Sequence, residues 1–417
     1  MEFFKNSKII AFILFCIVVF RSGHAFQTMF PTLTITLYIP AIIGMLFILS
    51  DRDCLNLRKP QNVALGVFAL MVVTTAIVDM GSGINYYIQL ITTILAAYCI
   101  VCLYPFKKIT EYYLKLMTVV SIIALIGYIL VNNTSVLEIL PKMKNINDVK
   151  YGVGIIFNYI VDIPDRNCGM FWEPGLFATH LTCAIVFEMM TKKKASALRL
   201  ILFSVCIFTA NSSAGFVLWF LCMVLFFVRK KNVVLGHLKT IFSFVLLIAA
   251  IGLILNFDTI LAKTALGENE YFIKLSSDSI SDSSRNNAIS HNLKMFMTDP
   301  VFGAGYATVM KNIAHVADTS TSTFLMSIFG VLGMSYTVFI VYGVLKIKNA
   351  NFLSKILLLV IMIVIVNKEP HHQIFFTWIL IFYLSKGFDD EKIEIEEKEK
   401  FKVIDGEKHG IKKLSKR

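Results

Sequence analysis

Residues 112–131 read YYLKLMTVVSIIALIGYILV, a run in which only Lys115 is charged, and runs of this kind decide the fold. A helix of about 20 mostly apolar residues spans the hydrocarbon core of a bilayer. Similar runs recur along the chain, and we predict membrane-spanning helices near residues 9–20, 32–50, 62–79, 85–104, 112–131, 171–190, 198–210, 213–228, 240–256, 322–343, 353–366 and 372–385. The predicted fold is an all-α polytopic integral membrane protein with about 12 transmembrane helices.

Composition and charge agree with this prediction. Of the 417 residues, 56% are hydrophobic and only 16% are charged, a balance that no soluble globular domain needs. Lys and Arg gather between alternate spans, at Lys5, Lys8, Arg52, Arg58, Lys59, Lys107, Lys108, Lys115, Lys192, Lys193, Lys194, Arg199, Arg229, Lys230, Lys231, Lys239, Lys346, Lys348 and Lys355. Because positively charged connectors stay in the cytoplasm, we place these connectors and both termini there. The net charge of +12 then reflects anchoring beside anionic headgroups, which argues against a nucleic-acid-binding protein.

Two long connectors lie on the opposite, periplasmic side, at about residues 132–170 and 257–321. Long loops in compact proteins are usually functional. In the second, apolar residues at helical spacing between 286 and 297 predict a small amphipathic cap on the membrane surface. We therefore divide the chain into a transmembrane domain, residues 1–388 with both loops, and a charged cytoplasmic tail, residues 389–417.

The sequence contains no clear signal-peptide cleavage site, disulfide framework or metal-binding motif. The first apolar run has no evident small-residue cleavage site, so we expect a retained helix rather than a signal peptide. The eight cysteines and eight histidines follow no disulfide framework or metal-ligand spacing. We predict neither a metal nor another cofactor.

The first candidate site lies where the first long loop re-enters the membrane. Pro174 suits the first turn of a helix, so Glu173 would cap that helix and share one face with His180. Ionisable residues in the outer half of a span are functional candidates by default, because they are costly to keep there. Structural alternatives stay open for both: Glu173 could cap the helix and pair with Arg166, and His180 could be a hydrogen-bonded core residue.

Two further groups of small polar residues stand at the predicted outer ends of spans. Asn211, Ser212 and Ser213 form a tight hairpin tip that could donate to sugar or phosphate oxygens, or could simply cap the next helix. Ser320 and Thr321 begin another span, where their hydroxyls could face a polyhydroxylated ligand. Asp318 or Ser320 is the expected helix cap there.

The second long loop contains Arg285 and, after it, Asp299-Pro300-Val301-Phe302-Gly303-Ala304-Gly305. A guanidinium matches two phosphate oxygens, and the backbone at Gly303 and Gly305 could cradle a pyrophosphate. The alternative for a lone loop arginine is a solvated charge. His291 and His315 are candidate proton shuttles without a predictable partner.

In their order along the chain, these clusters resemble the O-antigen polymerase and ligase superfamily, and Wzy-type polymerases in particular. The resemblance covers most of the chain. Its most specific element is the Asp299-Pro-x-Phe-Gly-x-Gly305 run, followed by Phe329-Gly-x-x-Gly333. It implies a glycosyltransferase of the bacterial inner membrane that polymerises undecaprenyl-pyrophosphate-linked oligosaccharides into O-antigen, capsule or exopolysaccharide, with membrane lipids, a chain-length regulator and a flippase as partners.

The resemblance also implies roles for the candidate residues. Arg166 and Arg285 would hold the donor pyrophosphate without a metal. Glu173, or else His180, would be the general base for the attacking sugar hydroxyl. Ligase-like members carry a His-Asn pair where this chain has Asp318-Thr319-Ser320-Thr321, which favours a polymerase over the ligase alternative. A flippase for the same lipid-linked sugars is the alternative of another class, although charges through the middle of its spans would be expected.

Overall fold

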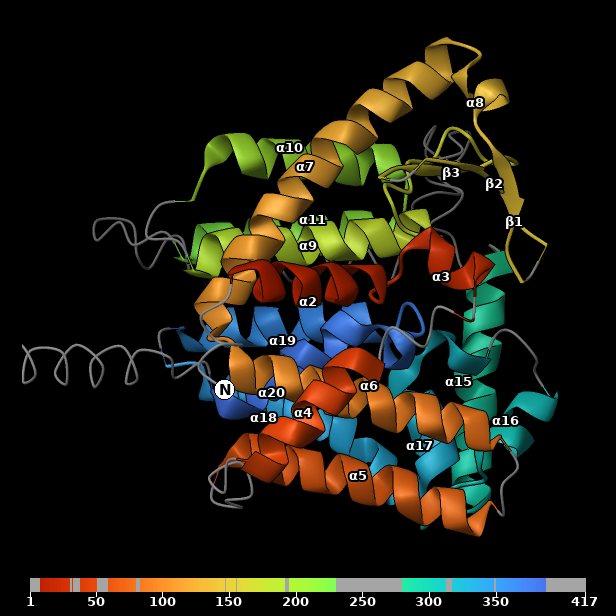
Figure 1. The fold of residues 1–417 in the computed structure, drawn as a ribbon, viewed down its shortest axis with the longest axis vertical. Coiled ribbons are helices and arrows are strands. Elements are labelled where there is room, and N and C mark those ends of the chain that lie inside the picture. Colours follow the sequence, from red (N-terminus) through yellow and green to blue (C-terminus); the bar gives the residue numbers. More distant parts are fainter. Residues whose placement is uncertain are drawn as a thin grey trace, which may run out of the picture.

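The chain folds into a bundle of helices with a small sheet at one end, as Figure 1 shows. The computed structural model describes residues 8–30, 32, 38–50, 59–79, 83–146, 148–154, 156–191, 195–229, 280–312, 317–348 and 350–387. The α-helices are α2 (Lys8–Phe20), α3 (Ala25–Met29), α4 (Tyr38–Ser50), α5 (Pro60–Val78), α6 (Ile84–Leu103), α7 (Phe106–Asn133), α8 (Val136–Ile139), α9 (Pro174–Thr191), α10 (Ala197–Ala210), α11 (Ser213–Arg229), α15 (Ile280–Thr298), α16 (Tyr306–Asn312), α17 (Thr321–Phe329), α18 (Ser335–Lys346), α19 (Phe352–Val366) and α20 (Phe375–Lys386). Three short 3-10 helices join them: η5 (Ala317–Thr319), η6 (Gly330–Met334) and η7 (His371–Gln373).

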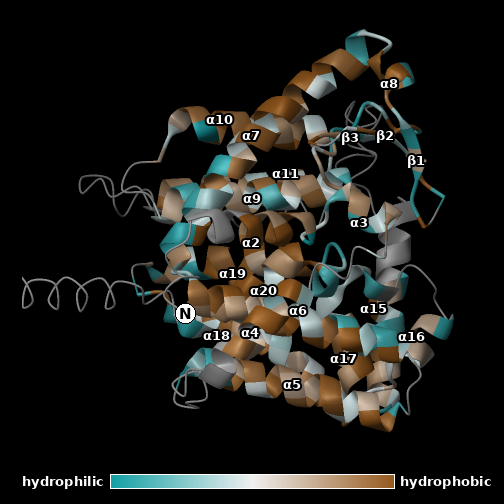
Figure 2. Ribbon diagram, in the orientation of Figure 1, coloured by the Kyte–Doolittle hydropathy of each residue, from teal (hydrophilic) through white to brown (hydrophobic). Residues whose placement is uncertain are grey.

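The structure is mostly helical, which agrees with an all-α membrane protein. Within the described ranges, four helical segments are long and apolar enough to cross a membrane: α5, α6, α7 and the continuous Thr321–Lys346 segment of α17, η6 and α18. The helices α10, α11, α19 and α20 are apolar but shorter. Figure 2 shows hydrophobic residues along the bundle helices and hydrophilic ones mainly near their ends. The predicted span at 240–256 lies outside the described residues.

One face of α7 shows why this bundle needs a lipid environment. Large apolar side chains remain exposed there at helical spacing, at Val119, Ile122, Ile126 and Ile129. The opposite face, with Val120 and Ala124, is buried. A continuous apolar stripe of this kind is unfavourable in water and favourable against acyl chains. The pattern therefore indicates that α7 contacts lipid.

Helices α9 and α20 form the centre of the bundle. Each is buried on nearly all sides, and neither has a polar face. Helices α7, α10 and α11 pack on α9, whereas α5, α6 and α18 pack on α20. A helix that is apolar all round is stable only when other helices or lipid surround it. The polar residues where these two helices begin are therefore held in a rigid setting.

A three-stranded antiparallel sheet occupies part of the first long loop. Its strands are β1 (Lys142–Lys144), β2 (Lys150–Val153) and β3 (Asn158–Ile160), in the order β1-β2-β3. Lys142 pairs with Gly152, and Tyr151 pairs with Ile160. We call the end of the bundle that carries this sheet, where α9 and α20 begin, the sheet end. The sheet was not predicted, because strands of three or four residues leave no clear alternation in the sequence.

Helix α15, which begins at Ile280, forms part of the second long loop. It lies across the sheet end at a steep angle to the bundle helices (Figure 1). An ordered helix was predicted here, but its packing differs from the prediction. Ala288 and Asn292 are buried, whereas the apolar residues Leu293 and Met297 are exposed. The amide of Asn292 donates to Thr323 Oγ1 of α17 at 3.2 Å, so small and polar residues make this contact.

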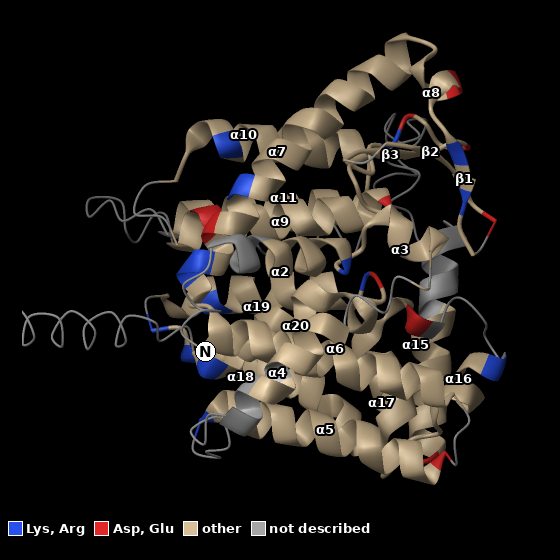
Figure 3. Cartoon of the chain, viewed as in Figure 1, with Lys and Arg blue, Asp and Glu red and all other residues tan. Residues whose placement is uncertain are grey.

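The charges are distributed unevenly along the bundle. Figure 3 shows Lys and Arg at both ends of the bundle, with one group of them on the helix ends opposite the sheet, and few in the middle of the helices. At the end opposite the sheet, Arg199 pairs with Glu188, with 3.1 Å between Nη2 and Oε1, and Glu188 is fully buried. The same carboxylate oxygen accepts a hydrogen bond from the backbone N–H of Ser196 at 2.7 Å. These bonds fix the connection between α9 and α10.

Candidate functional site

A turn between α19 and α20, residues 367–373, joins several helices at the sheet end. The side-chain oxygen of Asn367 accepts hydrogen bonds from Ser320 Oγ and from the backbone N–H of Ser322, both at 3.1 Å. Thr321 Oγ1 donates to the carbonyl oxygen of Glu369 at 3.1 Å. The start of α17 therefore holds this turn in place. Ser320 and Thr321 are buried and bound to the turn, which corrects the prediction that their hydroxyls face a ligand.

The turn brings Lys368 and Glu369 against the first turn of α9. Both side chains are buried, at 6% and 5% exposed. Lys368 Nζ donates to Ser212 Oγ at 2.6 Å. A Cβ on Gly175 would lie 2.7 Å from Lys368 Nζ and 2.8 Å from Glu369 Oε1, so only a glycine lets α9 approach this closely. A buried cation and a buried carboxylate thus lie side by side where α9 begins.

Arg21 follows α2 and enters the same region. Its carbonyl oxygen accepts a hydrogen bond from the backbone N–H of Phe375, the first residue of α20, at 3.2 Å. The residue is only 1% exposed, and among the described residues its Nε has no hydrogen-bond partner. Burial lowers the pKa of Arg21 to about 10. A buried guanidinium nitrogen without a partner is unfavourable, and such groups in native proteins call for an explanation such as a ligand.

We call Arg21, Ser212, Lys368 and Glu369 the outer cluster. Ser212, Lys368 and Glu369 meet at the first turn of α9, and the backbone of Arg21 is bonded to the first residue of α20. No role was predicted for Arg21 or Lys368 from the sequence. The available signal was the Lys-Glu-Pro-His-His run at 368–372, which interrupts two apolar runs on the side where Lys is sparse.

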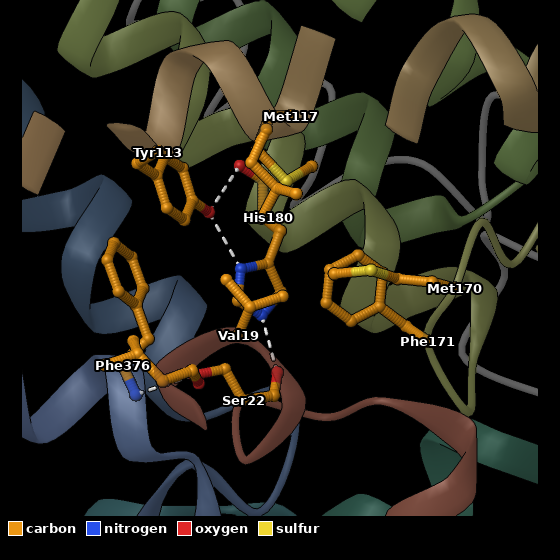
Figure 4. Close-up of a pocket in the computed structure, with 10 residues that line it drawn as sticks. Val19, Ser22, Tyr113, Met117, Met170, Phe171, His180 and Phe376 are labelled. Carbon is orange, nitrogen blue, oxygen red and sulfur yellow. Dashed lines mark hydrogen bonds between the residues drawn. The ribbon is translucent and has the colours of Figure 1, made fainter. Parts of the chain in front are cut away.

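His180 has a structural role, which corrects its assignment as a possible base. Figure 4 shows its ring between Tyr113, Ser22 and Phe171. Nε2 lies 2.8 Å from the carbonyl oxygen of Ser22, and Tyr113 Oη lies 2.7 Å from Nδ1. Because a carbonyl only accepts, the Nε2 proton donates to Ser22, and Nδ1 accepts from Tyr113. Both nitrogens are occupied, and the ring stacks on Phe171 at 4.3 Å, so His180 ties α2, α7 and α9 together.

Within the described residues, Glu173 and Arg166 are not bonded to the outer cluster. Glu173 is exposed, whereas His180 is buried, so the predicted shared face does not form one site. Within the described part of the chain, no ion pair joins Glu173 to Arg166, and no hydrogen bond joins Arg166 to the outer cluster. Arg166 is half-buried, and its Nε has no partner among the described residues.

The hairpin between α10 and α11 agrees with the helix-capping interpretation, and its predicted binding of sugar or phosphate oxygens stays a prediction. Asn211 ends α10 with φ 46°, a left-handed conformation that asparagine tolerates. Ser212 Oγ accepts from the backbone N–H of Gly215 at 3.3 Å and therefore caps α11. The same oxygen accepts from Lys368. Ser213 is the first residue of α11, and Ser212 before it joins the outer cluster.

Gly303 packs against the backbone of residues 328–330 and Gly305 against the side-chain carboxylate of Asp79, an arrangement that does not form the predicted pyrophosphate cradle. Both have φ +76°, and a Cβ on Gly303 would overlap the carbonyl group of Ile328. The N–H groups of Gly303, Ala304 and Gly305 donate to the carbonyl oxygens of residues 299, 327 and 328 at 3.0, 2.8 and 3.3 Å. These donors are used within the protein. Residues 299–305 and 327–331 together form what we call the glycine junction, so the two most family-like motifs contact each other.

The remaining predicted residues belong to the second long loop. Arg285 lies in helix α15 rather than in an irregular loop, and its side chain is outside the described part of the structure, as is residue His315. His291 lies in α15, and its Nε2 is buried without a partner among the described residues. No group of three or more His, Cys, Asp or Glu that could hold a metal ion occurs in the described ranges.

No protein-family model matches the chain, and no curated protein matches it.

Proposed function

We propose that the chain is a membrane glycosyltransferase of the Wzy polymerase type, in the bacterial inner membrane. It joins undecaprenyl-pyrophosphate-linked repeat units into O-antigen, capsule or exopolysaccharide. In this proposal about 12 helices cross the membrane, both termini are cytoplasmic, and the sheet end faces the periplasm. The excess of Lys and Arg in alternate connectors of the sequence supports this orientation, because those connectors that the structure describes lie at the end opposite the sheet (Figure 3). The family resemblance in the sequence supports the activity.

The observation that carries the proposal is the pair of buried cations at the sheet end, Arg21 and Lys368. Nucleotide sugars are cytoplasmic, so a transferase acting on the outer side needs a donor carried by a lipid pyrophosphate. A guanidinium and an ammonium preset at this place would stabilise the negative charge that develops as pyrophosphate leaves. Arg21 and Lys368 thus take the role that the sequence suggested for Arg166 and Arg285.

Glu369 is the general base of this proposal in place of Glu173. The acceptor hydroxyl attacks the anomeric carbon of the donor sugar, the bond to the pyrophosphate oxygen breaks, and the hydroxyl proton passes to the base. Glu369 is buried beside Lys368, whereas Glu173 is exposed to solvent. Burial also shields this carboxyl group from competing water.

The test is chain extension by the purified protein in lipid nanodiscs, with an undecaprenyl-pyrophosphate repeat unit as substrate and a gel ladder as readout. We expect Arg21→Met to remove the ladder and Arg21→Lys to restore little of it, because an ammonium lacks the forked donors. Glu369→Gln should slow extension by about 100-fold or more. Glu173→Gln is the matched control and should extend normally.

The opposite pattern would overturn the proposal. A normal ladder from Arg21→Met would remove the pyrophosphate role, and a loss confined to Glu173→Gln would return the base to that residue. Transfer of a finished glycan to a single acceptor, without a ladder, would identify a ligase. Movement of the lipid-linked unit across the bilayer without any product would identify a flippase.

A further inference from the structure

Four aromatic rings meet beside the outer cluster, each from a different element. They are Tyr86 of α6, Tyr306 of α16, Phe324 of α17 and His372 of η7, and we call them the aromatic cluster. Tyr86 and Tyr306 stack with ring centres 4.0 Å apart and planes 9° apart. His372 lies 4.8 Å from Phe324 and 5.8 Å from Tyr86 between ring centres. Residues far apart in the sequence thus pack into one group of rings at the sheet end.

The aromatic cluster contains polar atoms that the protein does not use. His372 is 2% exposed, and neither of its ring nitrogens has a hydrogen-bond partner among the described residues. The hydroxyl oxygen of Tyr86 is also buried without a partner in the described ranges. A neutral imidazole offers one donor and one acceptor, and a phenol offers both. Native proteins rarely keep such atoms buried and unbonded unless something else binds them.

A carboxylate and an amide stand next to these rings. Asp318 of η5 accepts a hydrogen bond from Gln373 Nε2 at 3.4 Å. Burial raises the pKa of Tyr306, and the nearby Asp318 carboxylate raises it further. Asp318 therefore lies close to the aromatic cluster. None of the four rings is cationic at neutral pH, so the cluster is poorly suited to a phosphate. An acyl chain, in turn, would not bond to the imidazole and hydroxyl atoms.

We propose that the aromatic cluster is a sugar subsite, which binds the acceptor end of the growing glycan. The apolar faces of a sugar ring pack on aromatic side chains, and its hydroxyls bond to groups such as His372 Nδ1, His372 Nε2 and Tyr86 Oη. This inference rests on the proposed function, because His372 of the aromatic cluster and the base Glu369 share the turn 367–373. His372 follows Glu369 by three residues, so a sugar bound here presents a hydroxyl toward the base.

The chain offers a matched pair of variants for the test. Tyr86→Phe removes one buried hydroxyl from the aromatic cluster. Tyr336→Phe removes another buried hydroxyl that has no partner in the described residues, but from α18, where its ring packs on Trp378 at 5.2 Å. Each change deletes a single oxygen atom, so both variants should fold. His372→Phe is the second variant, because it keeps a ring and removes both nitrogens.

The experiment is saturation-transfer NMR on the purified protein with the methyl glycosides of glucose, galactose, N-acetylglucosamine and N-acetylgalactosamine. We expect at least one glycoside to bind the native protein. Tyr86→Phe should weaken that binding by about tenfold, and His372→Phe should remove it. Tyr336→Phe should leave it unchanged. Binding of none of the four to the native protein, or equal weakening by Tyr86→Phe and Tyr336→Phe, would overturn the inference.

A parallel titration with farnesyl pyrophosphate separates this inference from the proposed function. If that probe binds in an Arg21-dependent manner while no glycoside binds, the sugar subsite is wrong and the pyrophosphate role stands. If a glycoside binds through Tyr86 while the probe binds equally well to Arg21→Met, the proposed function loses its main support. The sugar subsite then stands alone.

Discussion

Replacing Arg21 by Met should stabilise the folded protein while it removes activity. The fall of the Arg21 pKa from its ordinary value of ~12.5 to about 10 disfavours the charged form in the fold. At 1.36 kcal/mol per pKa unit this corresponds to about 3 kcal/mol. The residue is 1% exposed, so solvent screening reduces this figure little. Replacing buried ionic groups by apolar residues of similar volume independently gives gains of about 1–4 kcal/mol.

The pH range of this effect follows from the direction of the shift. Because the folded state holds the Arg21 proton less tightly than the unfolded state, the full penalty is present at neutral pH, where both states are protonated. It is relieved only as pH rises above about 10, where the folded state releases the proton first. A measurement near pH 7 therefore sees the whole difference.

Thermal unfolding in detergent, followed by size-exclusion chromatography, measures the effect. We expect the Tm of Arg21→Met to rise by roughly 5 °C. Farnesyl pyrophosphate at about 100 times its Kd should stabilise the native protein by about 2.7 kcal/mol and the variant much less, so the gap should nearly close. Arg21→Lys, which keeps a cation, should not show the rise. A lower Tm for Arg21→Met, or an equal ligand shift in both proteins, would refute the reasoning.

Two further predictions concern the fold, with Tm as the measurement. Gly303→Ala should destabilise by about 2 kcal/mol or more, because of its φ of +76° and the overlap with a backbone carbonyl. Gly66→Ala, in helix α5 with no atom within 4 Å of the added Cβ, should instead stabilise by up to about 1 kcal/mol. Arg199→Ala should destabilise the folded protein by about 3–5 kcal/mol, because it leaves the buried Glu188 carboxylate without its cationic partner. Adding Glu188→Leu should recover most of that loss, and no recovery would mean that the pair acts through other contacts.

Sequence patterns predicted the helices well because lipid imposes the same demand on every span. The run 112–131 lies within α7, and the predicted span 171–190 closely matches α9. Those interpretations needed only local composition and length. The sheet escaped prediction because its strands are too short for their periodicity to stand out.

The site was less predictable because burial depends on contacts between distant segments. Glu173 and Glu369 look alike in the sequence, each beside a proline at the start of a helix or turn. Only the packing of the turn 367–373 against Gly175 distinguishes the buried carboxylate from the exposed one. Likewise, a glycine with positive φ serves a phosphate cradle and a close backbone contact equally well, so Gly303 could not be assigned from its residue type.

The glycine junction also determines where α15 lies. Three backbone hydrogen bonds fasten residues 300–305 to 327–331, just beyond the last turn of this 19-residue helix. The bond from Asn292 to Thr323 fastens the helix to α17 a second time, about one and a half turns before its end. Two attachments at different heights fix the direction of a helix as well as its position, so the junction and Asn292 together orient α15 across the sheet end.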